Sequence, residues 1–132
     1  MVFQLIYASE LSEKLRLGDV ELVLEASQKN NPAMNVTGLL FFSIPYFIQL
    51  LEGDEQDVRN LYEKVKQDER HRKVRIIKEQ HVDNRLFDGW SMAYINDSDK
   101  VRAWVEKEFP TVLADPFSNA GTDFFEGLQK FL

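Results

Sequence analysis

Apolar residues fall into short runs that are separated by polar stretches along the whole chain. The first run, Val2–Ala8, predicts a strand that begins almost at the first residue. Helical spacing then predicts a helix from about Asp19, which ends at Asn30-Asn31-Pro32 because proline disfavours the α conformation of the residue before it. The positions that follow i, i+3, i+4 and i+7 spacing are Val20, Val23, Leu24 and Ser27.

The middle of the chain predicts a hairpin, a second helix and further strands. The run LLFFS is followed by a turn at Ser43–Pro45 and by the apolar run Tyr46–Glu52, and so short a connection favours an antiparallel pair. Asp54 is a candidate N-cap for a helix that continues to about Asp68. The remaining strands are expected at about Val74–Val82 and Gly89–Ile95.

The order of these elements predicts the fold class. A βαββαβ order with one added strand is typical of a ferredoxin-like α+β sandwich, in which both helices cover one face of a mixed sheet. We expect this domain to span residues 1–96, and residues 97–132 to form a C-terminal helical extension that packs on the sheet. Within the extension, a loop bracketed by Pro110 and Pro116 should separate two helices. Its apolar residues either cover the second face of the sheet, which is the favoured interpretation, or form a surface for a partner. These residues are Trp104, Val105, Phe124, Phe125 and Phe131.

The charge balance narrows the range of partners. The 132 residues carry a net charge of −6, and an acidic chain is a poor candidate for non-specific nucleic-acid binding or for an anionic membrane surface. The start, MVFQLIYASE, lacks the basic region of a signal peptide, and no apolar run is long enough to span a membrane. The absence of cysteine excludes disulfides, thiol catalysis and cysteine-ligated zinc. We therefore expect a soluble, cytoplasmic protein.

Motifs for metal, hydrolytic or nucleotide chemistry are missing from the sequence. His71 and His81 lie on different elements without the spacing of a metal site, and two partly exposed histidines are the favoured interpretation. No G-x-S-x-G elbow, Walker A motif or G-x-G-x-x-G motif is present. The basic run Arg70–Lys73 is better explained as a solvated charge cluster than as a phosphate site. The motifs therefore give no support to hydrolytic, metal-dependent or nucleotide-dependent catalysis.

Two polar side chains stand on strands that should build the core. Tyr7 and Gln49 have apolar neighbours, and burying an amide without partners costs roughly 1–3 kcal/mol. Alternation puts Gln49 on the same side as Phe47 and Leu51, but the other side of this strand is apolar as well. The pattern alone therefore leaves the direction of the Gln49 side chain open.

Two further motifs allow both a structural and a binding role. Asn30 and Asn31 form a good helix stop, and their adjacent amides could also hydrogen-bond the polar edge of a ring. The stretch WSMAY, Trp90–Tyr94, puts an aromatic residue and a methionine at alternating positions of the last expected strand. Core packing is the more common role for such a pair.

Five stretches of the sequence together resemble the BLUF family of flavin-binding blue-light sensors. They are LIYAS, SQKNNPAMNVTGLL, FIQLLEG, QDERH and DGWSM, which occur in the family's order and with its spacing between about Phe3 and Ile95. The resemblance implies a ferredoxin-like fold with a non-covalently bound flavin between the two helices. The cofactor implied is FAD, with FMN as the alternative.

The resemblance also assigns roles residue by residue. Tyr7 matches the family's photoactive tyrosine, and Gln49 matches the glutamine that relays between this tyrosine and the flavin. Trp90 and Met92 match a pair of which one member faces the flavin. Asn35 stands where glycine is common, and asparagine tolerates the left-handed conformation that this place requires. The other positions implied to bind the cofactor are Val23 and Val65 beside the ring, Asn30 and Asn31 at its polar edge, Asp68 at the ribityl chain, Lys29, Arg70 and His71 at the phosphate end, and Ser27.

The function implied by the resemblance is light signalling, so the chain is expected to be a photosensor and not an enzyme. Light would drive electron and proton transfer from Tyr7, Gln49 would exchange hydrogen bonds, and the signal would leave by protein–protein interaction with a downstream signalling protein of unknown identity. A homo-oligomer is also expected, because an uncovered sheet face favours association. The competing interpretations are a ferredoxin-like interaction module without flavin, which an absorption spectrum would reveal, and a small flavin reductase, which a turnover assay would reveal.

Overall fold

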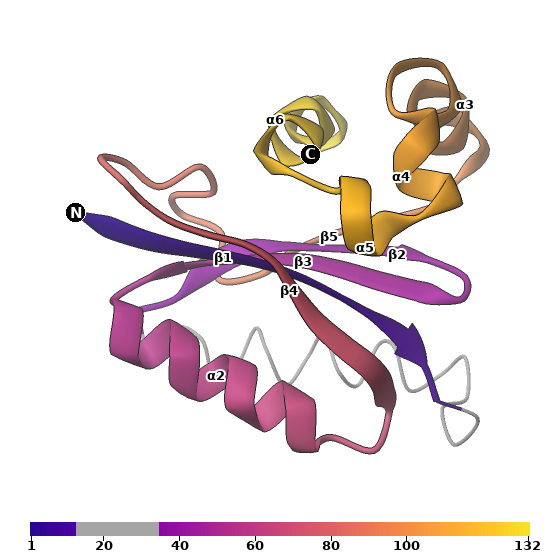
Figure 1. Cartoon of the computed structure of the whole chain (residues 1–132). Helices are drawn as coiled ribbons and strands as arrows, with labels where there is room; N and C mark the ends of the chain where they lie inside the picture. Colours follow the sequence, from indigo (N-terminus) through magenta and orange to yellow (C-terminus); the bar gives the residue numbers. More distant parts are fainter. Residues whose placement is uncertain (13–34) are drawn as a thin grey trace.

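The computed structural model describes residues 1–12 and 35–132 of the chain (Figure 1). The helix expected from about Asp19 lies outside these residues. So do five of the positions expected to bind a cofactor, namely Val23, Ser27, Lys29, Asn30 and Asn31.

A five-stranded sheet forms the centre of the molecule, in the order β4-β1-β3-β2-β5. The first four strands are antiparallel to their neighbours, whereas β5 runs parallel to β2, so the sheet is mixed. This order confirms the ferredoxin-like α+β class with an added strand. The strands are β1 (Val2–Leu11), β2 (Thr37–Ser43), β3 (Tyr46–Gly53), β4 (His71–Val82) and β5 (Ala93–Asn96).

Two strands are longer than the sequence pattern predicts. β1 continues to Leu11 instead of ending at Ala8, and β4 begins at His71 instead of Val74. Their polar ends pair with each other, with Glu10 opposite Arg72 and Leu11 opposite His71. Ion pairs from Glu10 to Arg72 (3.2 Å) and Lys73 (3.6 Å) join the two ends, so side chains typical of a loop here stabilise strand pairing.

The hairpin of β2 and β3 depends on a close approach at its open end. A Cβ atom on Gly38 would lie 2.0 Å from the carbonyl oxygen of Leu50, so only glycine fits this position of the strand. Just before β2, Asn35 has a φ of 53°, which confirms that asparagine takes the left-handed conformation there.

Helix α2 (Glu55–Gln67) covers one face of the sheet, which we call the α2 face (Figure 1). Asp54 is the N-cap, as predicted, and its carboxylate accepts hydrogen bonds from the backbone N–H groups of Gln56 (3.0 Å) and Asp57 (3.4 Å). The helix buries Val58 and Tyr62. The sheet residues of this core include Phe3, Leu5, Tyr7, Leu40, Phe47 and Leu51, and Met92, just before β5, belongs to the same core.

The C-terminal helices cover the opposite face, which we call the C-terminal face (Figure 1). Val105, Phe124 and Phe125 are fully buried, and Trp104 and Phe131 pack against the same core, which confirms that these residues cover the sheet. Sheet residues of this core include Ile6, Ala8, Leu39, Phe41, Ile48 and Leu50. The helices are α3 (Asp99–Glu108), α4 (Pro110–Ala114), α5 (Pro116–Asn119), α6 (Thr122–Leu128) and the 3-10 helix η2 (Gln129–Phe131).

The segment from Pro110 to Pro116 is not the loop that was expected. Each proline instead occupies the first turn of a short helix, where its missing N–H costs no hydrogen bond and its fixed φ suits the helix.

The C-terminal helices cover the sheet face whose exposure was the reason to expect a homo-oligomer. That reason is therefore removed, and the oligomeric state itself stays a prediction. No helix among the described residues is long and apolar enough to span a membrane.

The start of the last strand also differs from the prediction. β5 begins at Ala93, not at Gly89. Gly89 has a φ of 87°, and the Trp90 N–H donates to the Phe87 carbonyl (3.0 Å), so the chain makes a turn here. Trp90 therefore belongs to the connection between β4 and β5 and not to a strand.

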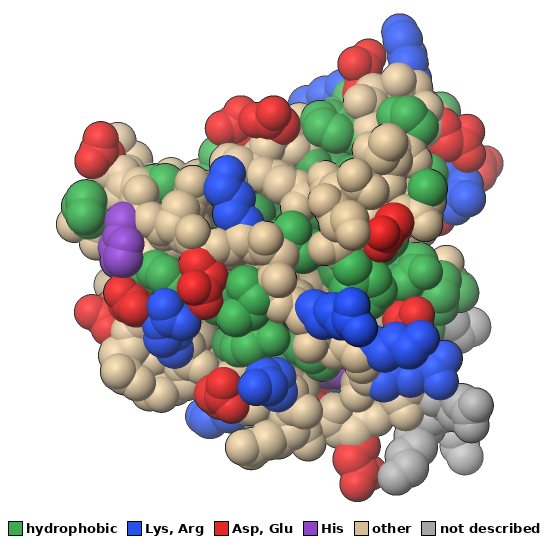
Figure 2. Space-filling model, viewed as in Figure 1, with side chains coloured by type: hydrophobic (Ala, Val, Ile, Leu, Met, Phe, Trp, Pro, Cys, Tyr) green, Lys and Arg blue, Asp and Glu red, His purple; other side chains and the backbone are tan. Residues whose placement is uncertain are grey.

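The surface carries interspersed charges of both signs (Figure 2). Basic side chains gather over the beginning of β4, where Arg72, Lys73 and Arg75 are exposed. β4 is an edge strand of the sheet, and charged side chains on an edge oppose pairing with another chain.

Candidate functional site

Tyr7 and Gln49 meet on the α2 face of the sheet. They are direct partners in the register of β1 and β3, and both are buried. The Tyr7 hydroxyl donates a hydrogen bond to Gln49 Oε1. The side chain of Gln49 therefore points into the core of the α2 face, together with Phe47 and Leu51 as alternation predicts. The choice of this face is what the sequence pattern had left open.

Met92 completes a chain of hydrogen bonds that begins at Tyr7. Gln49 Nε2 donates to the sulfur of Met92 at 3.1 Å. Met92 is 2% exposed, whereas Trp90 is 46% exposed. Of the two residues that the resemblance left undecided, the structure thus places Met92 on the α2 face beside Gln49.

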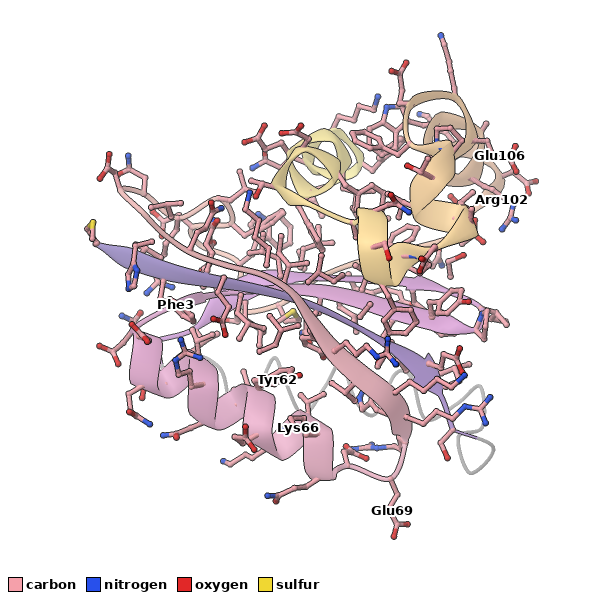
Figure 3. All side chains as sticks on the ribbon, in the orientation of Figure 1. Phe3, Tyr62, Lys66, Glu69, Arg102 and Glu106 are labelled. Carbon is pink, nitrogen blue, oxygen red and sulfur yellow. The ribbon has the colours of Figure 1, made fainter. Side chains whose placement is uncertain are left out.

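The Tyr7 phenol is held in its neutral form. Burial raises the pKa of Tyr7 well above its usual value, and the nearby Tyr62 and Asp68 raise it further. The Tyr62 ring lies 5.6 Å from the Tyr7 ring and projects from α2 toward the sheet (Figure 3). Tyr7 is therefore a hydrogen-bond donor to Gln49 over the whole physiological pH range.

Asp68 and Arg70 form a pair at the end of α2. The Arg70 guanidinium donates to both carboxylate oxygens of Asp68, with a shortest distance of 2.6 Å, and the Arg70 backbone N–H donates at 2.9 Å. Hydrogen bonds from the Arg70 side chain hold the pKa of Asp68 below its usual range. This pair stands at one end of the α2 face, where the resemblance implies the ribityl and phosphate groups.

His71 is buried, which corrects the expectation of two partly exposed histidines. Its Nδ1 lies 2.8 Å from Ser9 Oγ, and its ring packs against Phe47 at 4.8 Å between centroids. Burial lowers the pKa of His71 to about 4, so the imidazole is uncharged at neutral pH. His81 is exposed, as expected, and lies beside Glu55.

Because His71 is buried without a charge, acid should destabilise the protein through this residue. The unfolded chain binds the proton below pH 6.5, whereas the folded chain resists protonation down to about pH 4. Stability is therefore lost as the pH falls through this window, by about 2 kcal/mol between pH 7 and pH 5. Urea unfolding at both pH values should show a smaller loss in His71→Gln by about this amount. An unchanged pH dependence in His71→Gln would show that His71 is not buried in the neutral form.

The described part of the α2 face fits a flavin. A flat conjugated ring needs an apolar site with a few polar groups placed at its edge. The face is lined by apolar side chains, and the amide of Gln49 and the phenol of Tyr7 are buried among them. Val65, expected beside the ring, is half-buried and packs against the same core. Residues 13–34 lie outside the described part of the chain.

A comparison with protein-family models identifies this arrangement. The model of the BLUF family, described as sensors of blue-light using FAD, matches residues 2–93. The chain belongs to the BLUF family. The family consists of flavin-binding blue-light sensors, so photosensing by a bound flavin is confirmed at the level of the family.

Relatives of known name support this assignment. The blue light- and temperature-regulated antirepressor BluF of Escherichia coli is 35% identical over 71 residues, which are 54% of this chain and 18% of the antirepressor. The structure of BlsA in its photo-activated state matches 100% of this BLUF chain and 94% of BlsA, with 26% identity and a TM-score of 0.81. A bacterial light-regulated adenylyl cyclase matches all of this chain but only 37% of its own, with 28% identity and a TM-score of 0.77. The matched part of the cyclase is thus a sensor domain within a longer enzyme.

Sequence reasoning missed several buried polar groups of this BLUF chain, among them Ser9 and Glu52. Ser9, which lies just beyond the predicted end of the first strand, is fully buried as the partner of His71. Glu52, read as the end of a strand, is fully buried on the C-terminal face. A carboxylate at the end of the apolar run FIQLLEG was the signal that could have revealed the second group. No cluster of possible metal ligands occurs among the described residues.

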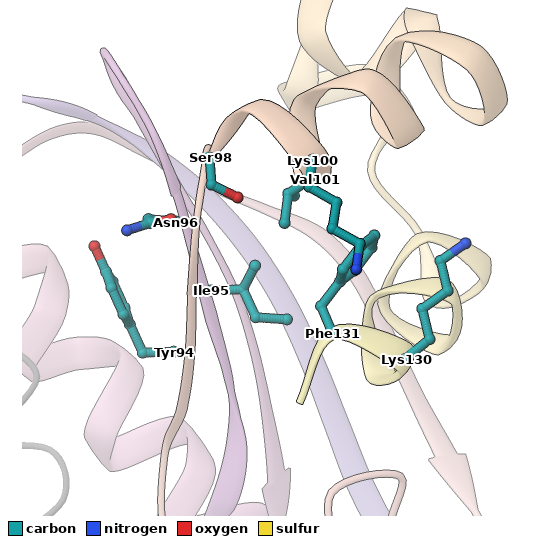
Figure 4. A pocket seen from close by; sticks show the side chains of 8 residues that line it. All are labelled: Tyr94, Ile95, Asn96, Ser98, Lys100, Val101, Lys130 and Phe131. Carbon is teal, nitrogen blue, oxygen red and sulfur yellow. The ribbon is translucent and has the colours of Figure 1, made fainter.

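A pocket of about 380 Å³ lies on the other side of the sheet, between β5, α3 and η2 (Figure 4). Ile95 and Phe131 point into it, whereas Tyr94 extends from the opposite side of β5 (Figure 4). Because Tyr94 packs on the α2 face, β5 separates this pocket from the Tyr7–Gln49 pair. The pocket is not part of the candidate flavin site.

Proposed function

We propose that this chain is a blue-light photoreceptor that binds FAD without a covalent bond and signals through changes in the hydrogen bonds of Gln49. The observation that carries this proposal is the buried chain from Tyr7 through Gln49 to Met92. An amide has both a donor and an acceptor, so Gln49 can exchange partners without leaving its place. A non-covalent flavin also agrees with the absence of cysteine from the sequence.

The cofactor would be held between the α2 face and the segment that precedes β2. Val65 would contact the ring, and Asp68 would bind the ribityl chain. Arg70 would lie at the phosphate end, together with His71, whose neutral ring can bond a phosphate oxygen but adds no charge at neutral pH. The proposed contacts outside the described residues are Val23, Ser27, Lys29, Asn30 and Asn31. FAD is proposed over FMN on the family's description.

A bound flavin would supply one chemical property to the site, the ability to take up an electron under blue light and to give it back afterwards. Tyr7 is the proposed donor of this electron. A phenol that has lost an electron is a strong acid, so the Tyr7 proton moves along its hydrogen bond to Gln49 Oε1. When electron and proton return, Gln49 is left rotated or in its other tautomer, with its bond to Met92 changed. The dry surroundings keep water from restoring the first arrangement, because buried polar groups have few other partners.

The signal would leave through the end of the sheet. Met92 directly precedes β5, and β5 leads through Asp97 and Ser98 into α3. We therefore propose residues 1–96 as the flavin-binding domain and residues 97–132 as the element that transmits its state. The output would be a contact with a downstream cytoplasmic signalling protein, and a homo-oligomer is proposed as the assembly that presents it. Neither nucleic acid nor membrane is proposed as a partner.

An absorption spectrum before and after illumination tests the proposed function. Protein purified with added flavin should be yellow, and blue light should shift the flavin absorption to the red, with return in the dark. The physical reason is a stronger hydrogen bond from Gln49 to the cofactor in the lit state. Chromatography of the released cofactor will distinguish FAD from FMN. A colourless protein after flavin supplementation, or a spectrum that light does not change reversibly, would refute the proposal, and steady oxidation of reduced nicotinamide would favour a flavin reductase.

A further inference from the structure

A second buried polar group lies on the same strand as Gln49, but on the opposite face. Glu52 is fully buried at the end of β3. Its Oε1 accepts hydrogen bonds from the Leu86 N–H (2.7 Å) and from Gln4 Nε2 (3.1 Å). Its Oε2 accepts from the Phe87 N–H (2.6 Å) and from the Thr37 hydroxyl (3.0 Å). Both carboxylate oxygens are thus saturated by donors, which is what a buried charge requires.

The donors around Glu52 explain why an acid stands here. Two consecutive backbone N–H groups, of Leu86 and Phe87, point at it from a connection without strand pairing. With the side chains of Gln4 and Thr37, four donors surround Glu52, and accepting from all four takes two oxygens with two lone pairs each, which a carboxylate offers and an amide does not. A glutamine would turn its NH₂ group toward one of these donors and leave that donor unpaired.

Glu52 and Gln49 hold the two ends of one short segment. Phe87 is bonded to Glu52 on the C-terminal face, and Met92 is bonded to Gln49 on the α2 face. Between them, the Trp90 carbonyl accepts from the Gly38 N–H at 3.2 Å. Residues 86–92, which we call the bridging segment, are thus attached to the β2–β3 hairpin at both ends and near the middle.

The Glu52 end of the bridging segment also reaches the C-terminal helices. The Gln129 side chain donates to the Leu86 carbonyl at 2.7 Å, and the Phe87 ring packs edge-on against Phe125 of α6. A second connection runs from Gln4 through Gln80, whose amide donates to Gln4 (2.8 Å) and to the Thr122 hydroxyl (3.1 Å) at the start of α6. α6 and η2 are therefore attached directly to the segment that Glu52 holds.

We propose that Glu52 is a positioning residue that attaches the bridging segment to β3, so that a change of the Gln49–Met92 bond moves the attached helices α6 and η2. The inference rests on the proposed function, since it needs Gln49 to change its bonds in light. A segment that is ordered by hydrogen bonds along its length passes a displacement of one end on to the groups attached at its other end, whereas a loose segment absorbs the displacement in local turns. With this attachment intact, α6 and η2 become the surface whose state depends on light.

The test compares Glu52→Gln with Glu10→Gln, which makes the same chemical change at an ion-paired residue away from the bridging segment. Absorption spectra and backbone amide exchange are measured on both variants and on the unsubstituted protein, in the dark and under blue light. In the dark, the Leu86 and Phe87 amides of Glu52→Gln should exchange faster by about tenfold, the equivalent of one lost buried hydrogen bond. The red shift should persist, while the light–dark difference in exchange of residues 122–131 should be lost. Glu10→Gln should retain both.

The outcomes separate this inference from the proposed function. A full light–dark difference at residues 122–131 in Glu52→Gln would overturn the inference and leave the red shift, and so the proposed function, untouched. A missing red shift in the unsubstituted protein would overturn both. If Glu52→Gln does not fold, Gln129→Ala replaces it, because it removes only the exposed bond to Leu86. That variant should show a smaller light–dark difference in α6 with a normal red shift, and an undiminished difference would overturn the inference.

Discussion

Tyr7→Phe is expected to abolish the light-induced red shift while the protein keeps its flavin. The substitution removes only the hydroxyl group, so the ring still fills its place on β1, where Tyr7 is 1% exposed. Without the hydroxyl there is no proton to pass to Gln49 Oε1, and the ring is a poorer electron donor. Difference absorption spectra under blue light measure the effect, and flavin content is read from the dark spectrum of the same sample.

Tyr62→Phe is the matched control for this prediction. Tyr62 is buried on the same face, and its ring lies 5.6 Å from the Tyr7 ring. The same chemical change at Tyr62 should preserve a reversible red shift, because the hydrogen bond from Tyr7 to Gln49 is left in place. A normal photocycle in Tyr7→Phe, or its loss in Tyr62→Phe alone, would assign the photoactive role to another residue than Tyr7.

Gln49→Leu is expected to abolish the red shift as well, for a different reason. Leucine is close to glutamine in size but can neither accept from the Tyr7 hydroxyl nor donate to Met92. The buried Tyr7 hydroxyl then lacks its acceptor, which should lower the free energy of unfolding by about 1–3 kcal/mol. Light-minus-dark spectra measure the first effect, and urea unfolding in the dark measures the second.

The control for Gln49→Leu comes from the other face of the sheet. Gln4 is also a buried glutamine of a central strand, but it bonds Glu52 and Gln80 on the C-terminal face. Gln4→Leu removes a buried amide in the same way and should leave the red shift intact. A reversible red shift of normal size in Gln49→Leu would contradict the proposal that this amide carries the signal.

Together, these variants separate the photochemistry from its transmission. Substitutions of Tyr7 and Gln49 should remove the spectral change itself, since both lie on the α2 face. Substitution of Glu52, on the opposite face, should leave the spectral change and remove its effect on α6. The two groups of variants thus report on the two faces of a single strand, β3, which carries both Gln49 and Glu52.

The sequence predicted the order of the elements well because the responsible forces are local. Alternating and helical apolar spacing, the Asp54 cap and the short hairpin connection each act within a few residues. These signals were enough for the ferredoxin-like class and for the place of α2. They failed at element ends, where Glu10 and Arg72 look like loop residues but pair across β1 and β4.

Other errors share one cause, which is that the deciding partner lies far away in the sequence. His71 was expected to be partly exposed, but it is buried against Ser9, which belongs to another strand of the sheet. Trp90 was expected in a strand, but it lies in the connection before β5, where Gly89 makes a turn and the distant Gly38 N–H donates to the Trp90 carbonyl. The buried role of Glu52 depends on donors that come from β1, β2 and the connection after β4.

By itself, the sequence determined the fold class, the BLUF motifs and the identity of Tyr7 and Gln49 as the polar residues that need an explanation. The resemblance implied that Gln49 turns toward Tyr7, which the structure confirms, but only the tertiary structure decided that Met92 and not Trp90 lies beside Gln49 and that Glu52 faces the other way. The physical reason is that both faces of β3 are apolar, so alternation defines two sides of the strand without distinguishing them. The distinction comes from buried donors and acceptors, which must find partners, and those partners come together only when the sheet has formed.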